Sequence, residues 1–327
     1  MKLSAKDILK YTILFLLGLL VLYLVFNGQN YDEIFSNIKN ANYYWLSLSA
    51  LIVLLAHWVR ALRWQMLIQA LGKPIALKHT FYAVMVGYLA NLAFPRLGEV
   101  TRCGVLNKKV DIGFTPLLGT VITERVIDLL SLLLVIILTV LIQFELIFSY
   151  LTQLLAVTKF NVTSIVISFL VILIVVLIGY LLLKKYQNIT LIQKIITFLN
   201  SLYIGLGSIF VLKNRWLFVF YTFLIWVLYI ASVYIAFWVL PDTSLLGAAA
   251  AFTVIVFGSL GMIAPVQGGI GAFHFMVTQA LKFYQINIAT GITLATLLHS
   301  SQALIIIVIG FLSLFLILRN KKPDEQT

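Results

Sequence analysis

Runs of apolar residues long enough to cross a lipid bilayer constrain this chain more than any other feature. A spanning helix needs about 20 consecutive apolar residues. We predict six spanning helices, at residues 8–26, 45–68, 117–143, 163–183, 216–240 and 289–318. Of the 327 residues, 62% are hydrophobic and 10% are charged, whereas soluble domains are about half apolar and a quarter charged. The strand alternation of an outer-membrane barrel is missing, so the sequence predicts an all-α polytopic membrane protein.

Residues 8–26 are predicted to stay on the chain as a helix rather than to be cleaved as a signal peptide. Lys2 and Lys6 precede them, but the following residues "NGQNYDE" contain no small-x-small cleavage site. The single cysteine, Cys103, excludes an internal disulfide. Because residues 184–215 read as an amphipathic surface stretch, no polar segment is long enough for a separate soluble domain, and we expect 1–327 to be one membrane domain.

Two further apolar segments, 79–94 and 245–263, end at prolines, "AFPRLGE" around Pro95 and "IAPVQGGIG" around Pro265. Each is followed by a second, moderately apolar stretch. Proline and clustered glycine break helices, and a broken backbone at membrane depth is tolerated only inside protein or beside a wet cavity. We therefore predict two re-entrant helical hairpins; the alternative, a full crossing at both positions, gives eight spans in place of six.

The distribution of Lys and Arg sets the predicted orientation. The net charge is +12, and in membrane proteins such an excess gathers on cytoplasmic loops, so we expect no nucleic-acid partner. With two hairpins and the N-terminus inside, 17 of the 23 basic residues flank the inner side, Arg60 and Arg63 among them, and three flank the outer side. Arg96, Arg102 and Arg125 fall within the membrane. The N- and C-termini are then cytoplasmic, in a protein of the cell membrane.

This layout predicts an inverted repeat of two halves, 1–150 and 151–327. Each half runs helix, helix, hairpin, helix, and the two start from opposite sides. The helix after each hairpin opens on related residues, "GTVITERVIDLL" (119–130) and "GITLATLLHSSQALI" (291–305). Inverted repeats are common in transporters, whose sites lie at broken helices near the midplane. The alternative is two unrelated helices that each end in proline.

Six ionisable residues lie at predicted membrane depth with formal charges that sum to zero. They are Arg96, Glu99, Arg102, Glu124, Arg125 and Asp128. One such charge costs about 2.5–3.5 kcal/mol at a helix centre, so we expect them to face inward and pair. Glu124 and Asp128 share a helical face and need a cation, for which an arginine is the natural source. The cluster either only locks the hairpin to the next helix, or binds an anion.

An arginine cluster at a broken helix suits a phosphate, because the guanidinium gives two parallel hydrogen bonds and stays charged. The backbone N–H groups that open the helix after Gly98 offer a further anion contact. In the second hairpin, glycines allow close approach of a ligand or helix, and the polar residues are Gln267 and His274. His274 reads as a proton carrier, a headgroup contact or a packed histidine; His299 reads as part of a ligand site or as a helix–helix hydrogen bond.

Three blocks of this sequence, "NLAFPRLGEVTRCGVL" (91–106), "TERVIDLL" (123–130) and "APVQGGIGAFH" (264–274), resemble a known family. It is the flippase-like membrane family that includes the transmembrane region of lysylphosphatidylglycerol synthases. The resemblance covers nearly the whole chain. It implies a lipid-translocating membrane domain. The aminoacyltransferase domain of the synthases has no counterpart here, so we do not expect this chain to make lysyl-lipid.

The resemblance implies a set of site residues. They are Asn91, Pro95, Arg96, Gly98, Glu99 and Arg102 in the first block, Glu124, Arg125 and Asp128 in the second, and Pro265, Gly268, Gly269 and Gly271 in the third. The third block of the family often continues to a glutamate where this chain has His274. To these residues we add Gln267, His274 and His299 as candidate substrate contacts.

The function that these observations favour is a lipid translocator that binds a phosphate-containing headgroup in a central polar cavity between the hairpins. The expected ligand is an anionic phospholipid or a polyprenyl phosphate, with no metal and no cofactor. One alternative is a membrane-embedded transferase or hydrolase on such lipids, with Glu99 or Asp128 as base, although no nucleophile–base pair stands at recognisable spacing. The other is a non-catalytic membrane partner of a lipid- or glycan-modifying enzyme.

Overall fold

The computed structural model describes residues 5–110, 112–146, 148–149, 193 and 212–319, and these residues form helices and connecting turns without a β-strand. The α-helices are α1 (Ala5–Phe26), α2 (Tyr31–Lys39), α3 (Tyr43–Gln69), α4 (Leu77–Ala93), α5 (Gly98–Asn107), α6 (Phe114–Ile142), α10 (Arg215–Ala236), α11 (Ala248–Ile263), α12 (Ala272–Lys282) and α13 (Ile288–Arg319). Three short 3-10 turns are η1 (Phe237–Val239), η2 (Pro241–Thr243) and η3 (Gln267–Gly269). The predicted all-α class is confirmed.

Four of the described helices, α3, α6, α10 and α13, are long and apolar enough to cross a membrane. They correspond to four of the predicted spans. The helices α1 and α2 meet the same test only as a pair, with a bend of 96° between them. The predicted span 163–183 lies outside the described residues, as does nearly all of the amphipathic stretch 184–215. The described residues thus contain four helices that could span a membrane, or five with the bent pair, as in an integral membrane protein.

The first predicted helix break is present between α4 and α5, which pack against each other. The backbone leaves the helix at Phe94 and turns through Arg96, which has a positive φ of 63°. Glycines permit the close packing: a Cβ on Gly87 would lie 3.0 Å from the Gly98 carbonyl oxygen. The sequence break is thus a tight turn between two packed helices, and its re-entry into the membrane stays a prediction.

The second predicted break lies between α11 and α12, which also pack against each other. Here the turn through η3 uses positive φ values at Gly268, Gly269 and Gly271, at 57°, 78° and 78°. A Cβ on Gly261 of α11 would lie 2.8 Å from the Cα of Phe273 in α12. Both pairs therefore need glycine where the helices cross, because any side chain would hold them apart.

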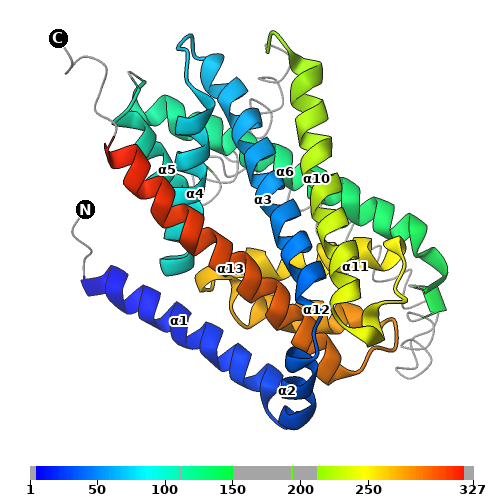
Figure 1. Ribbon diagram of the computed structural model, residues 1–327. Helices are drawn as coiled ribbons and strands as arrows, with labels where there is room; N and C mark the ends of the chain where they lie inside the picture. Colours follow the sequence, from blue (N-terminus) through cyan, green and yellow to red (C-terminus); the bar gives the residue numbers. More distant parts are fainter. Residues whose placement is uncertain (1–4, 111, 147, 150–192, 194–211, 320–327) are drawn as a thin grey trace.

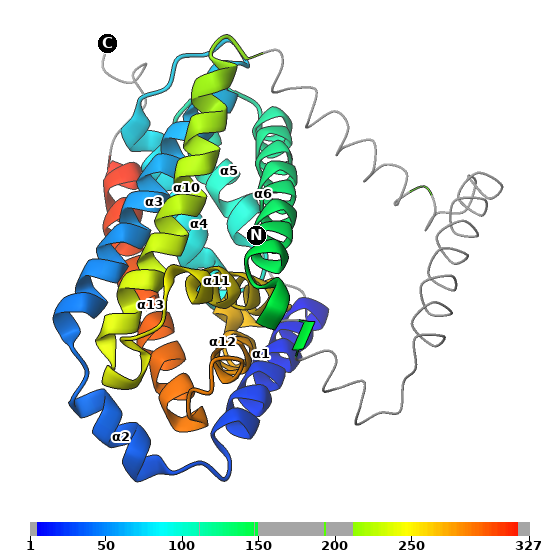
Figure 2. The ribbon, with the colours of Figure 1, turned by 90° about the vertical axis from the view of Figure 1, so that its right-hand side faces the viewer.

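The two helix pairs lie toward opposite ends of the molecule, and their turns approach each other (Figure 1, Figure 2). A Cβ on Gly268 of η3 would lie 3.0 Å from the Leu92 side chain at the end of α4. The long helix α13 packs on both pairs, against α4 and against α12. The two breaks are therefore neighbours, although Pro95 of the first and Pro265 of the second are 170 residues apart in the chain.

Buried apolar residues form one cluster around each helix pair. One cluster includes Trp64, Val84 and Leu106, and the other includes Val254 and Leu281. Large apolar side chains on the outer face of α6 are exposed, among them Leu133, Leu134 and Ile137. Lipid tails are as apolar as these side chains, so close packing rather than removal of apolar area from water holds the helices together.

Candidate functional site

Five charged side chains from three helices meet in the interior. We call this group the arginine cluster: Arg60 and Arg63 of α3, Arg102 of α5, and Glu124 and Asp128 of α6. Residues three or four apart on a helix share a face, so α3 presents two arginines and α6 presents two carboxylates to the same point. The arginine on α5 is placed beside them by the turn that follows α4.

Arg60 and Arg63 each bridge both carboxylates. Arg60 Nη1 donates to Glu124 Oε1 at 2.8 Å and to Asp128 Oδ2 at 2.6 Å. Arg63 Nη2 donates to Glu124 Oε1 at 3.2 Å and to Asp128 Oδ1 at 2.6 Å. The side chains of Arg63 and Glu124 are fully buried. The like-charged pair on α6 is therefore neutralised by α3.

The arginines of α3 also contact α10. Arg60 Nη2 donates to the Tyr229 hydroxyl at 3.4 Å, and Arg63 Nη1 donates to Thr222 Oγ1 at 3.3 Å. These bonds occupy further guanidinium hydrogens and orient both side chains toward the carboxylates. Three spans, α3, α6 and α10, are thereby tied together at one level.

Arg102 is held differently from the other two arginines. Its Nη2 lies 2.9 Å from Glu124 Oε2, but the pair is not aligned as a hydrogen bond. Nε and Nη2 of Arg102 are buried and donate to none of the described residues. The guanidinium lies over the indole of Trp64, 4.6 Å from the ring centroid, and the indole is fixed by a 2.9 Å bond to Thr120. Arg102 is therefore a buried cation with unused donors.

The charges of this region do not balance among the described residues. A separate, more exposed ion pair joins Arg125 to Glu99, and the side chain of Arg125 is 46% exposed. Together with the arginine cluster, four arginines face three carboxylates, which leaves a formal charge of +1. A buried charge without a counter-ion is costly, so this excess calls for an anion.

Arg60 and Arg63 were missed by the sequence prediction, which assigned them to the inner flank of the membrane. Their spacing of three on one helix face, "RALRW", was the available signal. Without these two arginines the predicted inner flank has fewer Lys and Arg residues, but it still has more than the outer flank. Arg96, in contrast, was predicted to join the buried charges, but it is exposed and forms no ion pair or hydrogen bond with the described residues. The expectation that the six predicted residues gather as one neutral buried group is thus wrong: Arg96 is not part of it, and Arg60 and Arg63 take part in its place.

Asn91 closes the turn in which Pro95 lies, between α4 and α5. Its Oδ1 accepts a 2.7 Å hydrogen bond from the backbone N–H of Gly98. One N–H at the start of α5, where the anion contact was expected, therefore already has a partner. Asn91 acts on the site indirectly, because the bond holds the start of α5 against α4 and so fixes Arg102 one turn further on.

The predicted residues of the second pair form a separate polar group. Gln267 Nε2 donates to the carbonyl oxygen of Tyr11 at 2.8 Å. His299 Nε2 lies 2.8 Å from the carbonyl oxygen of Gly268, and the rings of His274 and His299 are 5.0 Å apart. Pro265, Gly269 and Gly271 shape the turn around these side chains and contribute no charge. The structure thus brings the histidines together at η3, apart from the arginine cluster on α3, α5 and α6.

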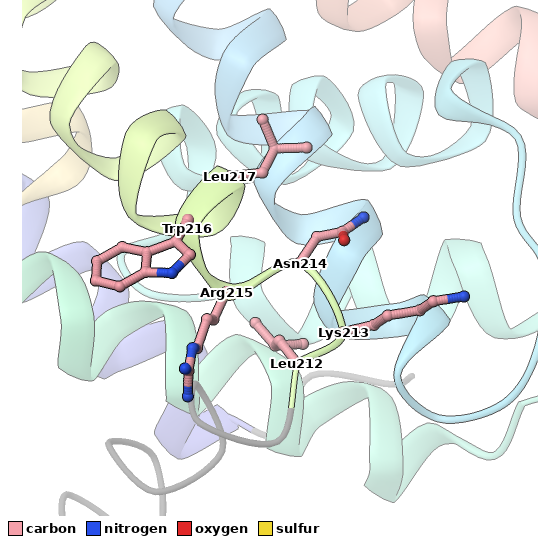
Figure 3. Close-up of a pocket in the computed structure, with 6 residues that line it drawn as sticks. All are labelled: Leu212, Lys213, Asn214, Arg215, Trp216 and Leu217. Carbon is pink, nitrogen blue, oxygen red and sulfur yellow. The ribbon is translucent and has the colours of Figure 1, made fainter.

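Three surface pockets stand out on the described residues, and no member of the arginine cluster lines them. One of about 460 Å³ is formed by Leu212–Leu217 at the start of α10 (Figure 3). A neighbouring pocket of about 360 Å³ includes Gln65 and Gln69 of α3. An apolar groove of about 510 Å³ runs between α3, α4 and α13 beside Trp58. Within the described part of the chain, no group of three His, Cys, Asp or Glu residues is arranged to hold a metal ion.

Comparison with known proteins identifies relatives over most of the chain. The family described as the lysylphosphatidylglycerol synthase TM region matches residues 8–310. The UPF0104 membrane protein MJ1595 of Methanocaldococcus jannaschii is 28% identical over 124 residues, which cover 37% of each chain. The match thus spans little more than a third of that relative's length. No solved structure matches the chain.

Proposed function

The chain belongs to the family of the lysylphosphatidylglycerol synthase transmembrane region, and on this premise we propose that it is a lipid translocator. In this proposal the arginine cluster binds the phosphate of one anionic lipid headgroup. The hydrocarbon chains stay in the bilayer, and the ligand is an anionic phospholipid or a polyprenyl phosphate. The N- and C-termini lie in the cytoplasm.

The observation that carries the proposal is the excess charge of +1 together with the unused donors of Arg102. A phosphodiester, as in phosphatidylglycerol, carries one negative charge and a phosphate monoester about 1.5 to 2, so a single headgroup is enough to offset the excess charge of the site. Its oxygens accept from a guanidinium fork in the same way as a carboxylate does. Arg60 and Arg63 are already engaged with both carboxylates, which leaves Arg102 as the principal ligand of the phosphate.

A purely structural role fits these observations less well. An ion-pair cluster that only locks helices together has no need of an unbalanced arginine, and apolar packing does the same work with less desolvation. Trp64 offers Arg102 a cation–π contact, which supports the guanidinium while leaving hydrogen-bond donors free for a ligand. Arg102 is thus a buried cation whose unused hydrogen-bond donors are available to a ligand.

The arrangement of the helix breaks supports translocation rather than static binding. The two breaks meet at Leu92 and Gly268 while their helix pairs lie toward opposite ends of the molecule. Inverted halves with broken helices around one central site are the architecture through which secondary transporters alternate access. Relative movement of the two pairs at this contact exposes the headgroup site first to one side of the membrane and then to the other.

Lipid movement in vesicles tests the proposal. The purified full chain is reconstituted in phosphatidylcholine vesicles with fluorescent phosphatidylglycerol, and transfer between leaflets is followed by quenching of the outer leaflet. We expect transfer to be about tenfold slower for Arg102→Gln, since a charge-assisted hydrogen bond contributes about 1.5–3 kcal/mol. Arg319→Gln, which removes an exposed arginine at the end of α13, should transfer lipid like the parent chain. Equal rates for both variants contradict the site.

A further inference from the structure

The two histidines at η3 form a buried polar site that the headgroup does not use. His274 on α12 is 4% exposed, and its ring faces that of His299 on α13 at 5.0 Å and 63°. Phe273 packs on His299 with ring centroids 5.5 Å apart. Two imidazoles in contact inside a membrane protein are unusual, because ionisable groups at membrane depth are costly and are commonly functional.

The bond from His299 to Gly268 fixes where protons lie. A carbonyl oxygen can only accept, so Nε2 of His299 carries the hydrogen and donates it across 2.8 Å. Nδ1 of the neutral ring is then free to take a proton. Because Gly268 is one of the residues with positive φ in the second break, His299 ties the break to α13.

Unpartnered buried atoms complete the site. His274 Nδ1 and Gln267 Oε1 are buried and hydrogen-bond to none of the described residues. Gln267 is itself anchored through Nε2 to the backbone of Tyr11. One of these unpartnered atoms is thus a ring nitrogen that can take a proton, and unsatisfied buried groups of this kind call for an explanation.

The described surroundings contain no charged partner that would hold such a proton permanently. The elements packed here are α1, α4, α11, α12 and α13. Besides the two imidazoles, the titratable group at the site in the described residues is Tyr11 of α1, which packs on Phe94. No described carboxylate, lysine or arginine pairs with either ring. Without a fixed counter-charge, a bound proton is easily released again.

The carboxylates of the arginine cluster are poor alternatives as proton carriers. Glu124 faces Arg60, Arg63 and Arg102, and Asp128 accepts from two of them. Protonation of either would leave buried arginines without a counter-ion, which costs more than it gains. Glu99 is likewise held by Arg125. The histidines at η3 can therefore take up a proton without breaking an ion pair, whereas His57, also buried, lies beside Arg60, whose positive charge opposes a proton there.

We propose that His274 and His299 share a binding site for one proton, which is occupied together with the anionic headgroup at Arg102. The proposal rests on the proposed function. One proton is expected because two imidazolium ions at this separation repel each other. The two sites are linked through the contact between the breaks: Gly268, which His299 bonds, packs on Leu92, next to the Asn91 that holds the start of α5. The linkage is reciprocal: the proton strengthens headgroup binding. A charged His299 also donates a stronger bond to Gly268, so protonation holds the second break against α13.

Histidine signals observed by NMR test proton binding without any transport. The chain has four histidines, so nitrogen-15 histidine labelling of the full chain in nanodiscs, with His57→Gln and His79→Gln for assignment, isolates His274 and His299. We expect these two to titrate as a coupled pair. Their midpoint should be higher in phosphatidylglycerol nanodiscs than in phosphatidylcholine ones, and this difference should vanish in Arg102→Gln. The proposal is overturned if both rings stay neutral at every pH. It is also overturned if the midpoint is the same in the two lipids and in Arg102→Gln.

The pH dependence of lipid transfer tests the coupling. Gln can still donate to Gly268 but cannot titrate, so His274→Gln/His299→Gln keeps the bond and removes the proton site. We expect transfer of fluorescent phosphatidylglycerol by the parent chain and by the His79→Gln control to vary about tenfold over two pH units. The double variant should vary less than about twofold. Equal pH dependence in all three overturns proton coupling while leaving the translocator intact; absence of transfer by the parent chain at every pH overturns the translocator and with it the coupled headgroup.

Discussion

Gly98 of α5 lies so close to Gly87 of α4 that a Cβ on Gly98 would overlap the Gly87 carbonyl oxygen. The same crossing brings Gly87 to Arg102, since a Cβ on Gly87 would lie 3.2 Å from the Arg102 Cβ. The hydrogen bond from Gly98 to Asn91 closes the turn just before it. The depth of Arg102 in the protein is therefore set by the contact between two glycines.

This contact predicts that two glycine-to-alanine substitutions in α5 change the stability of the protein very differently. Gly98→Ala must push α5 away from α4, and such overpacking costs about 1–3 kcal/mol. Gly104→Ala, also on α5, meets no atom within 4 Å and should stabilise the helix by up to about 1 kcal/mol. Thermal unfolding in detergent, followed by intrinsic fluorescence, measures both. Equal melting temperatures for the two variants would show that the crossing is looser than described.

Glu124 is predicted to be the carboxylate on which the fold depends most. Glu124→Gln leaves the facing arginines with a larger uncompensated charge, and loss of one partner of a buried ion pair costs about 3–5 kcal/mol. The matched variant Glu99→Gln affects a pair whose arginine side chain is 46% exposed, and solvent-accessible pairs contribute about 1 kcal/mol or less. Unfolding of both variants in the same detergent compares them. A smaller loss for Glu124→Gln than for Glu99→Gln contradicts the assignment.

The predicted orientation places the two ends of α3 on opposite sides of the membrane. In a Cys103→Ala background, cysteines replace Asn40 before α3 and Leu71 after it, both of which are exposed. A membrane-impermeant maleimide added to intact cells should label residue 40 and spare residue 71, whereas both react in opened membranes. Labelling of residue 71 alone in intact cells would show the opposite orientation. The assignment of the termini to the cytoplasm, which rests on charge asymmetry, would then be wrong.

Much of the fold was predictable because its determinants are local. Apolar length gave α3, α6, α10 and α13, and proline with clustered glycine marked both helix breaks. The spacing of Glu124 and Asp128 placed both carboxylates on one face of α6 and predicted that arginine must meet them. These features depend on a helical period or a backbone constraint that a few adjacent residues carry.

Which arginine meets the carboxylates could not be read from the sequence in the same way. The charge count assigned Arg60 and Arg63 to the inner flank although both fall within the predicted span 45–68, and the packing of α3 against α6 keeps both inside the protein. Arg96 lies in the break by sequence but points outward, because its positive φ belongs to the turn and not to a helix face. Partner choice depends on how α3, α5 and α6 pack, and that is a property of the tertiary fold.

The central claim is that the arginine cluster, through Arg102, holds one lipid phosphate. Native mass spectrometry of the chain, equilibrated with phosphatidylcholine and either phosphatidylglycerol or a polyprenyl phosphate, counts the bound lipid directly. The parent chain and Arg319→Gln should retain one anionic lipid. Arg102→Gln should retain about tenfold less, although it unfolds at a similar temperature because Glu124 keeps Arg60 and Arg63. Equal retention of both anionic lipids by Arg102→Gln and the parent chain would contradict the account.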